Sequence, residues 1–120
     1  MSHAGRALGA AGEEAAARAL VAAGWTLLDR NARVAAGEID LVVERGGVVG
    51  FAEVKARRSV AAGTPEEAVD ARKADRVARA AEEYLLRRGL AGTPMELLLI
   101  AVDLDAAGRP VAVRVGPLEG

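Results

Sequence analysis

The sequence lacks the residue types that several common functional sites require. It contains no cysteine and one histidine, His3, among 120 residues. The absence of cysteine excludes disulfide bonds, thiolate zinc sites and a cysteine nucleophile, and it fits a reducing cytoplasm. Aromatic residues amount to only 2%. Because single-stranded nucleic acids stack on aromatic rings, this low content argues against a single-strand binding protein.

Long apolar segments and a strong net charge are also missing. No apolar run approaches the roughly 18 residues of a membrane span, and no signal peptide is recognisable, so we expect a cytoplasmic protein without a membrane partner. The formal net charge is −1. A strongly basic total would have indicated a nucleic-acid partner. The near-neutral total lowers that expectation, but it is compatible with a small basic patch beside an acidic site.

Hydrophobic residues make up 52% of the chain, so there is ample material for a core. With so few aromatics, this core has to be built from alanine, valine and leucine. The length predicts a single domain spanning residues 1–120, of which we expect residues 1–6 to be a frayed terminus.

Hydrophobic periodicity predicts two helices and five strands. The spacing of apolar residues is helical over 7–23, and a second helix is expected from Pro65 to about Arg88, with a break near 70–72 as an alternative. The expected strands cover 25–30, 38–44, 48–56, 96–103 and an edge strand at 111–115, with a loop over 31–36. The order α-β-β-β-α-β-β predicts an α/β fold with a central mixed β-sheet flanked by α-helices.

Four ionisable residues interrupt two of these apolar strands. Glu38 and Asp40 lie in the stretch Gly-Glu-Ile-Asp, and Glu53 and Lys55 lie in Ala-Glu-Val-Lys. Side chains alternate along a strand, so each pair shares a face. If Gly46-Gly47 is a two-residue hairpin loop, opposed residue numbers sum to 93. This register would place Asp40 opposite Glu53 and Glu38 opposite Lys55.

Two interpretations of this charged face are open. A ladder of ion pairs explains Glu38 opposite Lys55, but it does not explain two facing carboxylates, which repel each other. A divalent cation would offset the excess negative charge, and carboxylate oxygens suit Mg²⁺ or Mn²⁺. The opposite face is wholly apolar and is expected to be core, whereas Val42 and Phe51 lie between the charges and indicate a half-buried charged face.

Glu13 also allows two interpretations. It lies at the edge of the apolar stripe of the first helix, whereas Glu14 and Arg18 lie opposite the stripe as a solvated i,i+4 pair. From periodicity alone, an acid of the first turn that interacts with the helix dipole is the simpler account of Glu13.

Beyond these patterns, an ordered set of motifs covers nearly the whole chain and resembles the YraN-like proteins, an uncharacterised bacterial family within the PD-(D/E)xK nuclease superfamily. Ile39-Asp40 stands where the superfamily pattern has Pro-Asp. The matching stretches are Gly-x-x-Gly-Glu at 9–13, Arg-Asn-x-Arg at 30–33, Gly-Glu-Ile-Asp at 37–40, Phe-x-Glu-Val-Lys-x-Arg at 51–57, Gly-x-Pro at 63–65 and Lys73.

The resemblance implies a restriction-endonuclease-like fold and assigns roles to the charged residues. Asp40 and Glu53 would hold the metal, Lys55 would be the catalytic lysine, and the backbone carbonyl of Val54 would be a further ligand. Archaeal Holliday-junction resolvases, which the chain also resembles, bring an acid of the first helix to the metal. That role would fall to Glu13, which reverses the preference for the dipole interpretation.

Several basic residues are candidates for contacts with nucleic-acid phosphates. Arg57 and Arg58 follow the predicted site directly, and Arg33 is a weaker candidate. Lys73 lies on the inner stripe of the second helix, where it either extends to solvent or reaches the site or a phosphate. Trp25 and Tyr84 are expected in the core.

The leading hypothesis is therefore a Mg²⁺-dependent nuclease for structured or branched DNA, with Glu38 in a supporting position. One alternative is a non-catalytic nucleic-acid-binding or adaptor protein that retains the site. Another is a structural ion-pair cluster that needs no metal. The choice between DNA and RNA stays open, and a homodimer or a protein partner would supply additional binding surface.

Overall fold

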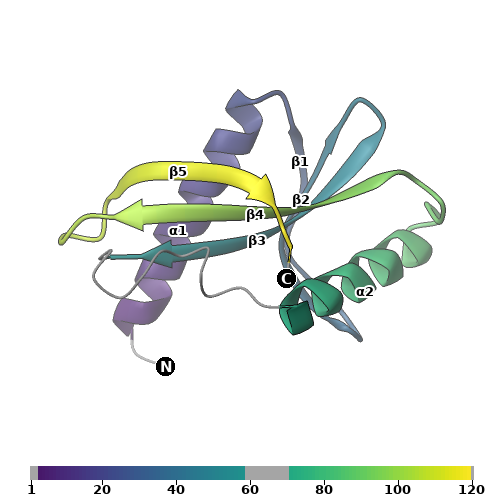
Figure 1. The fold of residues 1–120 in the computed structure, drawn as a ribbon, viewed down its shortest axis with the longest axis horizontal. Coiled ribbons are helices and arrows are strands. Elements are labelled where there is room, and N and C mark those ends of the chain that lie inside the picture. Colours follow the sequence, from purple (N-terminus) through teal and green to yellow (C-terminus); the bar gives the residue numbers. More distant parts are fainter. Residues whose placement is uncertain (1–2, 59–70, 120) are drawn as a thin grey trace.

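The computed structural model describes residues 3–58 and 71–119, which form one five-stranded mixed sheet with a helix on each face (Figure 1). The strands follow one another in sequence order across the sheet, and all neighbours are antiparallel except β3 and β4. A parallel pair needs a crossover, and α2 lies in the connection between these two strands. The predicted α/β class and element order are thus confirmed. The elements are α1 (His3–Ala22), β1 (Thr26–Val34), β2 (Gly37–Arg45), β3 (Val48–Arg57), α2 (Ala71–Arg87), β4 (Met95–Leu104) and β5 (Pro110–Pro117).

The main differences from the predicted elements lie near the N-terminus. Helix α1 begins at His3 rather than at residue 7, and β1 continues through most of the predicted loop, 31–36, which was wrong. The loop is reduced to a turn at Ala35 and Ala36, whose N–H groups donate to the two carboxylate oxygens of Glu83 at 2.9 and 3.0 Å. The part of the second predicted helix before residue 71 lies outside the described residues.

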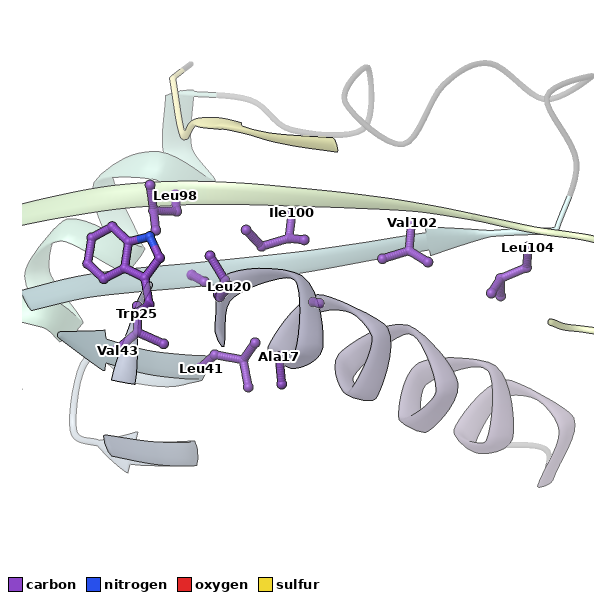
Figure 2. Close-up of a cluster of buried hydrophobic side chains, with 11 residues drawn as sticks. Ala17, Leu20, Trp25, Leu41, Val43, Leu98, Ile100, Val102 and Leu104 are labelled. Atoms are coloured by element: carbon purple, nitrogen blue, oxygen red, sulfur yellow. The ribbon is translucent and has the colours of Figure 1, made fainter. Parts of the chain in front are cut away.

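The α1 face of the sheet carries the larger apolar cluster (Figure 2). Leu20 of α1 packs there against Leu41 of β2 and Ile100 of β4, all fully buried. Trp25 joins the same cluster, as expected, and its ring lies where a side chain on Gly50 would stand. Burial of this apolar surface is the main driving force that fixes α1 across the sheet. In the described segments, no helix is long and apolar enough to cross a membrane.

The α2 face is also closed, and this corrects two details of the prediction. Val42 and Phe51 are fully buried beneath α2 rather than half-buried, and Phe51 meets the ring of Tyr84 edge-on at a centroid distance of 5.7 Å. Ile39 packs with them, whereas Leu41 packs on the α1 face. The expected alternation along β2 therefore fails at Asp40, where the pairing of β2 with β3 also ends.

Candidate active site

The turn of the β2–β3 hairpin sets the position of the charged residues. Gly46 and Gly47 have φ angles of 58° and 81°, as a two-residue turn with positive φ at both positions requires. The rungs run from Arg45–Val48 to Leu41–Ala52, and each pair of residue numbers sums to 93. The predicted loop length and register are therefore confirmed along this part of the hairpin.

The ladder ends one residue before the acids. Its last rung is Leu41–Ala52, so Asp40 and Glu53 do not form the rung that the register predicted. Instead, the N–H of Val54 donates to Oδ2 of Asp40 at 2.8 Å, while β3 continues alongside β4. The Asp40 side chain thus takes the place of a backbone partner where β2 and β3 separate. We call this point the fork. Figure 1 shows β1 and β2 leaving the direction shared by β3, β4 and β5.

Helix α1 brings Glu13 to this fork because it approaches β3 closely. A Cβ on Gly12 would stand 2.7 Å from the Cβ of Ala56, closer than packed carbon atoms tolerate. Only glycine at this position lets the helix lie so near to the strand. Since α1 begins at His3, Glu13 lies in the middle of the helix, which excludes the interpretation as a first-turn acid.

The carboxylates influence one another across the fork. Burial and, to a smaller extent, the charges of Glu53, Glu13 and Glu38 raise the pKa of Asp40 to about 7, against the opposing hydrogen bond from Val54. Burial also raises the pKa of Glu13, with smaller contributions from Glu38 and Glu53. The site therefore concentrates more negative charge than its surroundings stabilise.

Two lysines lie on one side of these acids. Nζ of Lys73 is 2.9 Å from Oε1 of Glu53, and Nζ of Lys55 is 3.8 Å from the same oxygen. Side-chain exposure is only 12% for Glu53 and 18% for Lys73, so their ion pair is largely shielded from water. Of the two positions left open for Lys73, the structure shows the one in which it reaches the site.

The two ammonium groups are not equivalent. A hydrogen bond with Lys73 lowers the pKa of Lys55, and burial and the charge of Lys73 lower it further. Burial alone would lower the pKa of Lys73, but its hydrogen bonds to Lys55 and Glu53 outweigh this effect and raise it. Lys73 is therefore the more firmly protonated of the two, and Lys55 is the one closer to its neutral form.

The remaining predicted residues lie at the margins of the fork. Glu38 pairs loosely with Arg33 at 4.0 Å rather than with Lys55, so the ion-pair ladder does not form as predicted. Arg57 ends β3 two residues after Lys55, on the same face, and Arg58 follows as an exposed residue. The roles predicted for these residues and for the carbonyl of Val54 stay predictions.

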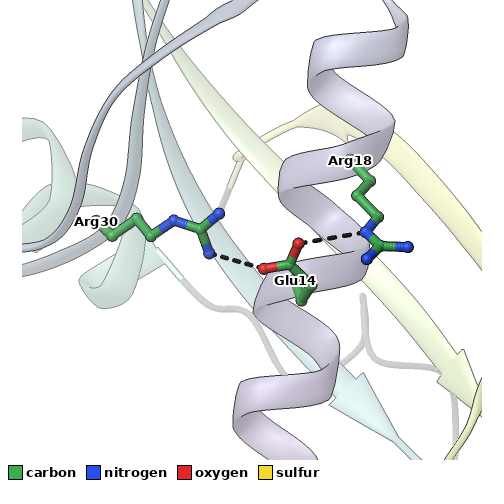
Figure 3. Close-up of polar contacts among 3 residues, drawn as sticks. All are labelled: Glu14, Arg18 and Arg30. Atoms are coloured by element: carbon green, nitrogen blue, oxygen red, sulfur yellow. Dashed lines mark hydrogen bonds and ion pairs between the residues drawn. The ribbon is translucent and has the colours of Figure 1, made fainter.

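Asn31 is a site residue that sequence reasoning missed. Its side chain forms a hydrogen bond with Glu13, and its φ of 50° is the one positive value among the described residues other than glycine. The neighbouring residue Arg30 binds Glu14 at 3.1 Å, and Glu14 also binds Arg18 at 3.2 Å (Figure 3). Two adjacent acids of α1 are thus held by two adjacent residues of β1. The Arg-Asn-x-Arg motif was the available signal, but these residues were expected in a loop.

The donor set fits a hard cation in its chemistry, although it does not form a ready cage. Within residues 3–58 and 71–119, no three acidic or histidine side chains are gathered closely enough to hold a metal ion as they stand. Glu53 is engaged by Lys73, and Asp40 by the N–H of Val54. However, Asp40 and Glu13, whose pKa values are raised beside other carboxylates, are acids that a divalent cation would stabilise, and oxygen ligands suit Mg²⁺ or Mn²⁺.

Comparison with known proteins places the chain at the level of a family. The sequence profile of "Uncharacterised protein family UPF0102" matches residues 12–106. A UPF0102 protein of Symbiobacterium thermophilum is 46% identical over 104 residues, which cover 87% of this chain and 88% of the relative. A UPF0102 protein of Moorella thermoacetica is 44% identical over 110 residues, which cover 92% of each chain. These names state no activity, so the nuclease superfamily stays a prediction.

Proposed function

The chain belongs to the uncharacterised protein family UPF0102, and we propose that it is a Mg²⁺-dependent nuclease that hydrolyses phosphodiester bonds in structured or branched DNA. The observation that carries the proposal is the fork between β2 and β3. There, Glu13, Asp40 and Glu53 come from three separate elements, and burial together with the charges of Glu53 and Glu13 raises the pKa of Asp40. Next to them lie two lysines, one of which has a lowered pKa.

In this proposal Asp40 and Glu53 hold the metal, with Glu13 and the carbonyl of Val54 as further ligands. When bound, Mg²⁺ would polarise the phosphodiester and the attacking water. Glu53 would then be shared between the metal and Lys73. The positive charge of Lys73, next to Glu53, would stabilise the charge that develops on the phosphoryl oxygens.

Lys55 is suited to orient the attacking water. As that water adds to phosphorus, one of its protons passes to a neutral Lys55 amine or to solvent, and the bond to the leaving oxygen breaks. The leaving oxygen takes up a proton in turn. The lowered pKa of Lys55 favours this use because it increases the neutral fraction at a given pH.

The test combines metal binding with cleavage. Calorimetry with Mg²⁺ and Mn²⁺ at neutral pH should detect weak binding by the unaltered protein and none by Asp40→Asn. Cleavage of a labelled DNA four-way junction should then require the metal and should be lost in Asp40→Asn and Lys55→Ala. Glu14→Gln is the matched control, because it removes the neighbouring acid of the same helix, which binds only arginines. Metal-independent cleavage, or equal loss in the control, would contradict the proposal.

A second candidate is a non-catalytic nucleic-acid-binding adaptor. The observation in its favour is the short contact between Lys73 and Glu53, which already neutralises one of the acids without a metal. This candidate predicts DNA binding that is unchanged in Asp40→Asn and the absence of cleavage with either metal ion.

A further inference from the structure

The arginines of the protein fall into two groups, according to whether an acid neutralises them. In the described segments, six arginines pair with carboxylates at 4.0 Å or less: Arg18, Arg30, Arg33, Arg87, Arg88 and Arg114. Arg72, Arg76 and Arg79 of α2 form no ion pair with any described residue, and all three are exposed. We call these three the α2 arginine stripe, because their spacing of four and three residues places them on one side of the helix.

Helix stability does not explain this stripe. Like charges at a spacing of four residues destabilise a helix by a few tenths of a kcal/mol, and Asp75, the acid within the same stretch, lies on the flank of the stripe without pairing to it. The opposite side of α2 carries Val77 and Tyr84 into the core, and the three arginines of the stripe are exposed to solvent. A ligand with negative charge would offset the repulsion among the three guanidinium groups.

The stripe borders the candidate site. The stem of Arg76 lies against the start of β2, where its Cγ would be 3.6 Å from a Cβ on Gly37, the residue before Glu38. The charge of Arg76 also acts on Lys73, which contacts Glu53. Arg57 and Arg58, at the end of the strand that carries Lys55, likewise pair with no acid among the described residues. Within the described residues, cations without acid partners thus lie beside the start of β2 and at the end of β3.

We propose that the α2 arginine stripe, Arg72, Arg76 and Arg79, binds the phosphate backbone of duplex DNA and presents it to the candidate site. This proposal rests on the proposed function for the choice of DNA. The stripe extends about 10 Å along the helix axis at about 1.5 Å per residue. One strand of a duplex presents a phosphate about every 3.4 Å of axis, so two or three phosphates fall within its length. Exposed guanidinium groups bind such phosphates without reading sequence.

The experiment measures how DNA binding depends on salt. The unaltered protein, the triple variant Arg72→Gln/Arg76→Gln/Arg79→Gln and the control Arg18→Gln/Arg87→Gln/Arg114→Gln are titrated with a labelled DNA four-way junction in EDTA at several salt concentrations. Both variants lose three positive charges, but carboxylates already neutralise those of the control, so the control measures the effect of the lower net charge alone. Each phosphate contact contributes about 0.9 to the slope of log K against log salt. We expect the stripe variant to lose about 2 to 3 units of slope and the control to keep the slope of the unaltered protein.

Other outcomes overturn the inference. An unchanged slope in the stripe variant, equal losses in both variants, or no DNA binding by the unaltered protein would each contradict it. Circular dichroism spectra that match the unaltered protein ensure that the stripe variant is folded. Because EDTA prevents metal-dependent cleavage, this result is independent of catalysis. A protein that binds through the stripe but never cleaves DNA would refute the proposed nuclease and leave this inference standing.

Discussion

The two ends of the β2–β3 hairpin are built from the same strands but differ in pairing and in charge. From the Gly46-Gly47 turn to the Leu41–Ala52 rung, every residue is paired, and beyond Glu44 and Arg45 the side chains of both faces are apolar. Beyond that rung the ladder stops, and Asp40 and Glu53 follow. The end next to the turn, which we call the closed end, is fully paired. The end beyond the Leu41–Ala52 rung, which we call the open end, keeps carboxylates close enough to raise the pKa of Asp40. Local instability confined to one end of a well-paired element is typical of a functional site.

Truncation of the ring at the closed end should have the largest effect. Phe51→Ala removes a fully buried side chain that packs against Tyr84, and it should lower the free energy of unfolding by about 3–5 kcal/mol. Urea unfolding followed by circular dichroism measures the change. Val111→Ala, at an exposed position of β5, is the control and should cost less than about 0.5 kcal/mol. A similar small loss for Phe51→Ala would mean that the closed end is not the stable part of the hairpin.

A single substitution, at Gly12, should push helix α1 away from β3. Gly12→Ala places a methyl group 2.7 Å from the Cβ of Ala56, so the helix has to move away from β3. Such overpacking should cost about 1–3 kcal/mol, against the gain of up to about 1 kcal/mol that alanine gives in a helix. Gly9→Ala is a matched control in the same helix, because nothing lies within 4 Å of its added methyl group. The control should be neutral or stabilising. If both variants gained stability, the close contact would not constrain the helix.

Removal of the charge of Asp40, at the open end of the hairpin, should stabilise the protein. The pKa of Asp40 is about 7 in the folded state, against an ordinary value of 3.8. The unfolded chain therefore ionises Asp40 first, and folding stability is lost as the pH rises through this window. Asp40→Asn removes that loss and should raise the free energy of unfolding by up to about 4 kcal/mol near pH 8. The gain should fall towards zero below about pH 3, where Asp40 is protonated in both states.

Urea unfolding at several pH values tests this prediction, with the exposed Asp75→Asn as the control. Addition of Mg²⁺ sharpens the test. If the cation binds at the fork, it should stabilise the unaltered protein and reduce the advantage of Asp40→Asn. A variant that is less stable than the unaltered protein at pH 8 would show that Asp40 contributes to an ion-pair cluster, and the contrast between the two hairpin ends would be lost.

The closed end was also the part that the sequence predicted best. The paired glycines determine the turn, the turn determines the register, and alternation then assigns Leu41 and Ala52 to the core. The open end was predicted only in part. The predicted register, in which opposed residue numbers sum to 93, extends beyond Ala52, but the pairing of β2 with β3 ends there. The partner exchange of β3 from β2 to β4 is a tertiary effect without a local sequence pattern. The resemblance, rather than hydrophobic periodicity, predicted that Glu13 lies next to the other acids of the site.

Neither periodicity nor the resemblance assigned a role to Asn31, although the Arg-Asn-x-Arg motif contains it. A left-handed residue within a strand leaves no trace in hydrophobic periodicity, and the polar stretch around it is typical of a loop. Its hydrogen bond to Glu13 becomes visible only when α1 and β1 are placed together. The contact between Lys73 and Glu53 is similar, because it joins a helix and a strand separated by residues 59–70.

The smallest effects that we predict are those of two variants of Asn31, which distinguish the contribution of its backbone conformation from that of its side chain. Asn31→Gly keeps the left-handed conformation without strain and removes only the hydrogen bond to Glu13, so stability should change by no more than about 1 kcal/mol. Asn31→Ala loses the bond and also strains the backbone at a φ of 50°, which should cost about 1 kcal/mol more than the glycine variant. The bond favours the charged carboxylate, so both changes should raise the pKa of Glu13, as followed by carboxyl ¹³C NMR. If the pKa of Glu13 stayed constant in Asn31→Gly, the side chain would not position this acid, and the open end would depend on the strand backbone alone.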